Sequence, residues 1–473
     1  MMPRRRTAIL VVCCLAQFLA MLDVSLMNVA LEPVRADLGF SATGLQWVIN
    51  AYTLAAAGFL LIGGRAADLF GRRRVFVGGL ALFALASLAG GLAGHQAVLV
   101  AARAGQGLGG AVIAPASLSI LASAHAEGPQ RNRAFGFWGT LGGVGGASGA
   151  LVGGVITDAA SWRWVLLINA PIAAGLAVAS LRVLPAFGRE RRASRSFDLA
   201  GALTVTAGLV LVTYGIVTTH RYGWEAAATL GPLGAGVVLL AVFALIEGRL
   251  AAAPLVPPRI LRSRALVGAN AVAFCLGGAA FAMWFFVSLY VQRVLGLAPL
   301  QAGLTLAPIS LTIVAFTQAA SRLAGRLGPG RVLATGMTLL GTGMLLFSRV
   351  DSNGSWAADV LAPSLLCASG IGCSFVSNTI TANGGVREQD SGLASGLVTT
   401  SFQMGGSIGL AVMATIAAGQ TAALAGTTTP AAALTAGFQR AFTVAGCLAF
   451  AGAAVALALL AGREPARAAL ERA

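Results

Sequence analysis

The chain has 473 residues, of which 57% are hydrophobic and 10% are charged, against about 25% charged residues in an ordinary soluble domain. Its formal net charge of +16 comes from arginine, because the sequence contains no lysine, and nearly all of the 32 arginines lie in short gaps between apolar runs. This pattern excludes a soluble nucleic-acid-binding domain and predicts a multi-pass membrane protein. Since a P-loop needs a lysine, it also excludes an ATP site of that type.

A transmembrane helix needs about 20 mainly apolar residues, and the chain offers fourteen such stretches. The predicted spans cover residues 8–30, 45–64, 75–94, 97–121, 134–157, 164–184, 199–219, 228–247, 266–291, 302–321, 332–349, 359–381, 393–418 and 438–461. Most arginines fall on one side when these spans are threaded in order. By the positive-inside rule we expect both termini in the cytoplasm and the protein in the bacterial cytoplasmic membrane.

Two polar or proline-rich loops, 185–198 and 248–265, bracket the seventh and eighth spans. The expected fold is therefore an all-α membrane protein with two six-helix bundles and two inserted linker helices. The predicted boundaries are 1–190 for the N-terminal bundle, 191–262 for the linker helices and 263–473 for the C-terminal bundle.

A weak internal repeat supports this division. The loop after the second span reads GRAADLFGRRRV (64–75), and the loop after the tenth reads SRLAGRLGPGRV (321–332). In ungapped register Gly71 matches Gly328 and Arg74 matches Arg331. Parallel halves related by an axis along the membrane normal would place the two loops at equivalent positions.

Asp23 lies in the stretch LDVSLMNVA of the first span, and Arg103 lies in the fourth. A charge at the centre of a spanning helix costs about 2.5–3.5 kcal/mol on insertion scales, so an isolated one is unfavourable. At a rise of about 1.5 Å per residue, both groups lie roughly 10 Å below the outer surface. We therefore predict that they pair, either as a static ion pair between two helices or as a site that changes protonation.

The remaining reactive residues indicate no catalytic or metal site. Six cysteines lie within apolar segments without metal-ligand spacing, and three histidines are scattered in or beside loops. We expect no catalytic residue, no metal and no cofactor, and hence a protein that is not an enzyme.

Four segments together resemble the major facilitator superfamily and, within it, the fourteen-helix drug:proton antiporters, which are multidrug exporters. They are LDVSLMNVALEP (22–33), GRAADLFGRRRV (64–75), LVAARAGQGLGGA (99–111) and GGVGGASGALVGGVITDAASWRWVLLINAP (142–171). One departure is Ala150, which follows Gly149 where the antiporter motif usually has proline.

The resemblance implies roles for individual residues. Asp23 would carry the proton with Arg103 as its partner, and the span-five glycines Gly145, Gly149, Gly153 and Gly154 would form the antiporter motif. The loop motif Gly64, Asp68, Gly71, Arg72 and Arg73 would form a cytoplasmic latch, with the thirteenth span as the candidate partner of Asp68 and Arg72. The glycine spacing by itself predicts close helix packing.

Candidate substrate contacts are aromatic and amide side chains within spans, as suits lipophilic or cationic drug-like compounds. They are Trp47, Asn50, Tyr52, Trp138, Asn270, Gln318, Asn378 and Gln403. The expected function is efflux of small molecules in exchange for protons by alternating access. The expected partners are the substrate, protons and the lipid bilayer, with no nucleic acid and a monomeric state.

Two alternatives remain open. The altered span-five motif is compatible with a uniporter, or an importer or exporter of one metabolite, without proton antiport. A sensor or structural membrane protein is the alternative from another class.

Overall fold

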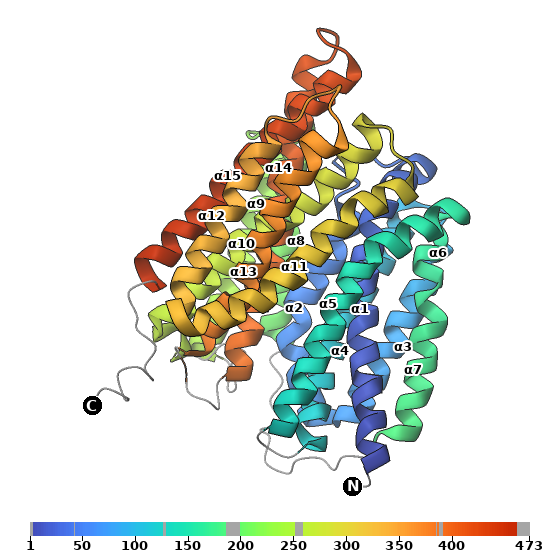
Figure 1. The fold of residues 1–473 in the computed structure, drawn as a ribbon, viewed down its shortest axis with the longest axis vertical. Helices are drawn as coiled ribbons and strands as arrows, with labels where there is room; N and C mark the ends of the chain where they lie inside the picture. The colour runs from blue at the N-terminus through green and yellow to red at the C-terminus, as the bar shows by residue number, and fades with distance from the viewer. Residues whose placement is uncertain are drawn as a thin grey trace. The chain divides into compact units, whose positions relative to one another are not determined.

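The computed structural model describes residues 3–41, 43–125, 129–185, 199–250, 259–384, 386 and 391–460. Within them the chain folds into helices (Figure 1). These are α1 Pro3–Leu38, α2 Trp47–Phe70, α3 Arg72–Gly91, α4 Gln96–Ala124, α5 Pro129–Ala159, α6 Trp162–Leu167, α7 Asn169–Val183, α8 Leu199–Tyr222, α9 Ala227–Leu245, α10 Arg264–Leu289, α11 Pro299–Leu327, α12 Pro329–Phe347, α13 Ala362–Gly384, α14 Ser391–Leu424 and α15 Pro430–Leu460. Every predicted span coincides with a helix or with the α6–α7 pair.

Twelve helical stretches of the described residues are long and apolar enough to cross a membrane. The apolar parts of α2 and α8, Trp47–Leu60 and Leu203–Thr219, are shorter than that. The structure therefore supports a multi-pass membrane protein, whereas the number of fourteen spans stays a prediction.

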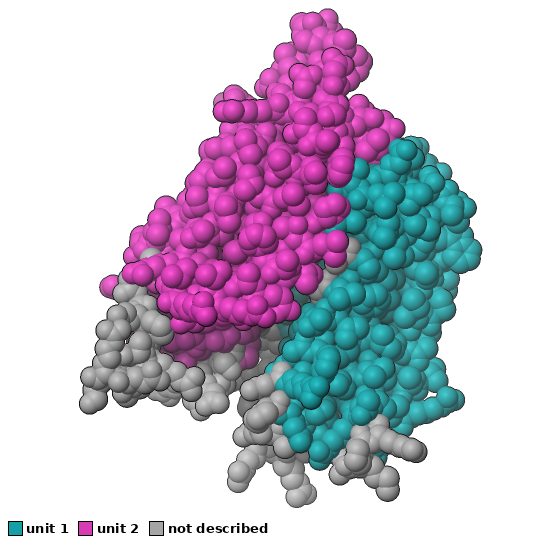
Figure 2. Space-filling view, in the orientation of Figure 1, with its two compact units in different colours: residues 1–210, 236–255, 298–307 teal, residues 211–235, 256–297, 308–473 magenta. Residues whose placement is uncertain are grey.

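The chain divides into two compact units (Figure 2). Unit 1 comprises residues 1–210, 236–255 and 298–307, and unit 2 comprises residues 211–235, 256–297 and 308–473. Helices α8, α9 and α11 thus contribute residues to both units. The predicted boundaries near 190 and 262 lie in or beside segments outside the described residues and remain predictions.

In unit 1 the glycines of α5 face α1, and the two helices lie side by side (Figure 1). A Cβ atom added to Gly145 would lie 2.5 Å from the carbonyl oxygen of Phe18, and one added to Gly149 would lie 2.4 Å from the Cβ of Ser25. Gly153 continues the same face against Leu26. Because these residues recur every fourth position, the α5 backbone rests directly on α1. Gly154 lies on another face, against Pro299 and Leu300.

Unit 2 uses the same device between α10 and α14. A Cβ on Gly277 would lie 1.9 Å from the carbonyl oxygen of Phe402, and one on Gly405 would lie 2.0 Å from that of Phe274. Gly409 meets Gly278, with 2.6 Å from its added Cβ to the Cα of Gly278. The predicted first and fifth spans of each half are therefore packed through glycine.

The two loops of the internal repeat also share a backbone conformation. Gly71 joins α2 to α3 with φ 95° and ψ 124°, and Gly328 joins α11 to α12 with φ 86° and ψ 139°. Residues with a side chain rarely adopt positive φ. Glycine at both positions thus allows a one-residue connection between α2 and α3 and between α11 and α12.

Candidate functional site

A buried ion pair joins α1 to α4 inside unit 1. The Nη1 of Arg103 donates to Oδ2 of Asp23 at 2.6 Å, and the side chains are 1% and 0% exposed. Both charges are therefore removed from solvent and from lipid. The structure thus pairs Asp23 with Arg103, as predicted from their similar depth below the membrane surface.

Arg103 is held by further contacts that do not involve Asp23. Its Nε donates to the carbonyl oxygen of Val48 at 2.9 Å, and its Nη1 donates to Oε1 of Gln106 at 2.8 Å. The guanidinium also lies over the Tyr52 ring, 4.6 Å from the centroid, as in a cation–π contact. These groups can retain Arg103 when the charge on Asp23 changes.

The close approach of α2 to α4 depends on Gly107. A Cβ on this residue would lie 2.2 Å from the carbonyl oxygen of Tyr52, so any side chain would push the helices apart. Without that contact, Val48 would move out of reach of Arg103. The glycine that follows Gln106 in the α4 motif thus supports the ion pair through the backbone.

The second oxygen of Asp23 accepts from two amides. Nε2 of Gln106 donates to Oδ1 at 2.9 Å, and Nδ2 of Asn169 donates to the same atom at 2.7 Å. Gln106 also donates to the hydroxyl of Ser87 at 2.9 Å. Helices α4 and α7 thus donate to the carboxylate of α1, while α2 contacts Arg103 and α3 contacts Gln106, so the polar network joins five helices.

Gln106 and Asn169 were not among the predicted site residues, although both occur in the segments that carry the family resemblance. Gln106 could have been found, because a residue three positions after Arg103 lies on the same helix face. Asn169 gives no such signal, since it lies 146 residues from Asp23 in the sequence. Only the tertiary structure brings it to the site.

The other predicted residues in unit 1 have different surroundings. Trp138 donates through Nε1 to the hydroxyl of Ser117 at 2.9 Å, and Trp47 is half-buried. Asn50 is fully buried, and neither its side-chain nitrogen nor its oxygen has a hydrogen-bond partner in the part of the chain that is described.

In unit 2 the predicted amides connect neighbouring helices. Asn378 donates to the carbonyl oxygen of Ala269 at 3.0 Å, and Asn270 accepts from the hydroxyl of Ser401 at 2.7 Å. Gln403 is half-buried and Gln318 is exposed. These four residues belong to the unit without the ion pair.

The predicted latch motif, residues 64–73, is described only in part. Gly64 lies in α2 and Gly71 ends it, whereas the side chain of Asp68 is outside the described residues. Arg73 donates from α3 to the carbonyl oxygen of Leu181 at the end of α7, and Arg72 is partly buried. Arg73 thus ties two helices of its own unit.

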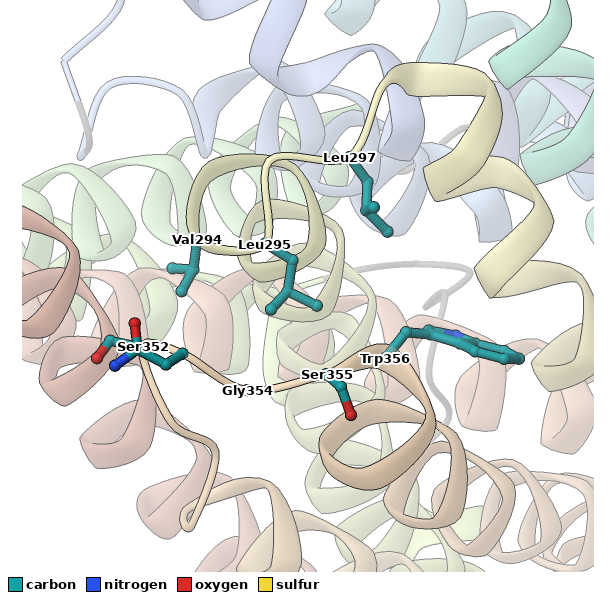
Figure 3. Close-up of a pocket in the computed structure, with 8 residues that line it drawn as sticks. Val294, Leu295, Leu297, Ser352, Gly354, Ser355 and Trp356 are labelled. Atoms are coloured by element: carbon teal, nitrogen blue, oxygen red, sulfur yellow. The ribbon is translucent and has the colours of Figure 1, made fainter.

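A pocket of about 470 Å³ lies in unit 2, separate from this cluster (Figure 3). It is lined by Val294, Leu295, Leu297, Ser352, Asn353, Gly354, Ser355 and Trp356. These residues precede α11 and α13, and none of them is charged. The pocket therefore offers no group for proton exchange.

The long apolar helices define a multi-pass membrane protein, and comparison with known proteins gives its class. Residues 13–410 match the Major Facilitator Superfamily, so the chain belongs to that superfamily and is a transporter rather than an enzyme. The resemblance seen in the sequence motifs is thereby confirmed.

Similar curated proteins are described as antibiotic exporters or resistance proteins. The chain is 44% identical to the cephamycin export protein CmcT of Amycolatopsis lactamdurans, over 87% of this chain and 85% of that protein. It is 38% identical to the puromycin resistance protein pur8 of Streptomyces alboniger, over 94% and 88%. A third relative, 32% identical over 84% and 73%, is the tetracenomycin C resistance and export protein of Streptomyces glaucescens.

Solved structures of transporters share the fold. A bacterial homologue of the human lysosomal transporter Spinster superposes with a TM-score of 0.67 at 14% identity, covering 97% of this chain and 98% of that one. A peptide transporter in complex with sulfate superposes with a TM-score of 0.70 at 16% identity, covering 95% and 94%. At this identity the likeness concerns the fold alone.

Proposed function

We propose that the protein exports small lipophilic or cationic drug-like compounds, antibiotics among them, across the bacterial cytoplasmic membrane in exchange for protons. The observation that supports proton coupling is the buried Asp23–Arg103 pair. In it, the carboxylate of Asp23 is enclosed by polar donors inside a helix bundle. The export of antibiotics is supported by what the relatives are described as doing.

Asp23 is the proton-carrying group in this proposal. Arg103 and the two amide donors enclose its oxygens, so a rearrangement that withdraws these groups opens the carboxylate to proton exchange. Arginine stays charged throughout. When Asp23 is protonated, Val48, Gln106 and the Tyr52 ring hold Arg103 in place.

The proton gradient supplies enough free energy for this exchange without any cofactor. One proton crossing 100 mV yields about 2.3 kcal/mol, and each pH unit adds about 1.4 kcal/mol. Exchange of one proton for one neutral compound can therefore support a concentration ratio of more than tenfold.

Substrate recognition is assigned to the aromatic and amide residues of the spans. Asn50 is the strongest of these candidates, since a buried amide without partners normally pairs with another polar group, which a bound compound can supply. Trp47, Trp138, Asn270, Gln318, Asn378 and Gln403 are weaker candidates, and Tyr52 is already engaged by Arg103.

The proposal includes the finer topology. Fourteen spans, with α8 and α9 as linker helices between two six-helix bundles, place both termini in the cytoplasm. Asp68 and Arg72 then lie at the cytoplasmic face, where they act as a latch, and the protein works as a monomer. Reporter fusions after residues 40, 125, 225 and 460 test this arrangement, since the first and third are expected outside and the others inside.

Uptake into everted vesicles tests the function. Vesicles containing the protein are expected to accumulate labelled puromycin or a lipophilic cationic dye when respiration acidifies their lumen, and an uncoupler should abolish accumulation. Uptake that is insensitive to the uncoupler and stops at equal concentrations would instead establish the uniporter. Lack of uptake of every such compound, with uptake of one metabolite, would favour the metabolite transporter.

A further inference from the structure

A second polar cluster lies at the C-terminal end of α1 and holds the short helix α6. Arg163 donates to Asp37 and, at 3.1 Å, to the carbonyl oxygen of Ala93. Trp162 donates through Nε1 to the same carboxylate oxygen of Asp37 at 3.0 Å, and its ring lies under the guanidinium at 4.5 Å. We call Asp37, Ala93, Trp162 and Arg163 the α6 clamp, because it ties α6 to α1 and to the α3–α4 loop.

The apolar side chains of α6 are buried and closely packed. Val165 and Leu166 are fully buried, and the side chains of Leu166 and Leu167 pack against Gly90 and Gly91 at the end of α3. Helix α6 is therefore fixed by a polar clamp on one side and by close packing on the other.

Asn169 begins α7, and the single residue Ile168 separates it from the end of α6 at Leu167. Pro171 has no N–H and cannot bond the carbonyl of Leu167, which accounts for the break between the two helices. Nδ2 of Asn169 bonds back to the carbonyl oxygen of Val165 at 3.3 Å while it donates to Asp23. The position of this amide thus depends on α6 as well as on α7.

We propose that Asn169 is a positioning residue for Asp23, and that the α6 clamp acts on the proton site through it. The proposal rests on the proposed proton coupling and extends it to residues that touch neither the proton nor the substrate. The clamp residues Trp162 and Arg163 precede Asn169 by seven and six residues, so they lie within the same short segment as this amide.

The direction of the effect follows from the groups that face Asp23. Helix α4 presents Arg103, α2 presents Tyr52, and α3 and α7 contribute the neutral Ser87 and Asn169. Loss of the Asn169 donor removes one of the two amide hydrogen bonds to Oδ1 of Asp23. Because N–H donors favour the charged form of a carboxylate, the pH of half-maximal transport is expected to rise.

The test compares pH profiles of proton-driven uptake into proteoliposomes containing the purified protein, with puromycin as the probe. Asn169→Leu is expected to raise the pH midpoint by about one to two units, the equivalent of a hydrogen bond to a charged group. Arg163→Gln is expected to raise it by about half a unit. The double variant should match Asn169→Leu alone, because the clamp acts only through the amide.

Ser180→Ala is the matched control. Ser180 is buried in α7, and among the described residues its hydroxyl bonds the carbonyl of Leu176 in the same helix, so its loss should leave the midpoint unchanged. If Asn169→Leu does not fold, the smaller Asn169→Ala removes the same donor and should shift the midpoint equally.

An unchanged midpoint in the Asn169 variant, with proton-driven uptake intact in the wild type, would overturn this inference and leave the proposed function standing. If the pH midpoint of the double variant shifts by the sum of the Arg163→Gln and Asn169→Leu shifts, the two residues act independently. That result would overturn the proposal that the clamp acts through the amide. Wild-type uptake without any proton dependence would overturn both the inference and the proposed function.

Discussion

The two units are packed alike but carry different chemistry. Glycines seat α5 on α1 in unit 1 and α14 on α10 in unit 2, and glycines with positive φ join α2 to α3 and α11 to α12. Yet the buried polar side chains among the described residues of unit 2 are uncharged serines and threonines and the single asparagine Asn378, whereas unit 1 buries Asp23 with Arg103. Helix packing is thus common to both halves, while the group proposed to carry protons is confined to one.

The largest expected effect comes from removing that charge. Asp23→Asn should abolish uncoupler-sensitive accumulation in everted vesicles while leaving energy-independent substrate exchange, because an amide cannot release a proton. The matched change in unit 2, Asn378→Leu, should leave the proton dependence unchanged. Intact proton-driven accumulation by Asp23→Asn would remove the distinction between the units.

The second test concerns stability. Arg103→Leu leaves Asp23 buried without its cation, and breaking a buried pair in this way costs about 3–5 kcal/mol. Asn378→Leu loses one neutral hydrogen bond, worth about 0.5–1.5 kcal/mol. Thermal unfolding in detergent should therefore show a much lower midpoint for Arg103→Leu, and adding Asp23→Asn to it should restore part of the loss. Equal losses for the two leucine variants would contradict the comparison.

The third test addresses what the units share. Gly145→Ala and Gly277→Ala should each lower stability by about 1–3 kcal/mol, since the new methyl group overlaps a backbone carbonyl of the facing helix. Gly146 and Gly419 face open space, so alanine there should be neutral or slightly stabilising. Thermal unfolding measures both pairs, and a loss in only one unit would show that the packing is not equivalent.

The smallest effect is expected at the turns. Gly71→Ala and Gly328→Ala place a side chain at positive φ, which should destabilise each variant by about 1 kcal/mol. Gly325→Ala, in the interior of α11 with nothing near its added Cβ, is the control. Similar shifts in thermal midpoint at both turns would support the internal repeat, whereas a shift at one turn alone would count against it.

Periodicity, charge placement and helix length predicted much of this architecture. The apolar stretches locate the helices, and equal depth brings Asp23 and Arg103 to the same level of the bundle. The break between α6 and α7 was missed, because hydropathy is continuous from Trp162 to Val183 and does not register that Pro171 lacks an N–H. The contact of Asn169 with Asp23 could not be predicted either, since it depends on how α7 is rotated against α1.

The order of synthesis gives the buried pair a further consequence. Arg103 follows Asp23 by 80 residues, and Asn169 follows it by 146. At about 5–20 residues per second, Asp23 is synthesised roughly 4–16 s before Arg103. During that interval the nascent chain must accommodate a carboxylate that has neither its cation nor its amide donors. The carboxylate of Asp23 therefore gains its cation only when α4 packs against α1, and its full set of donors only when α7 has followed.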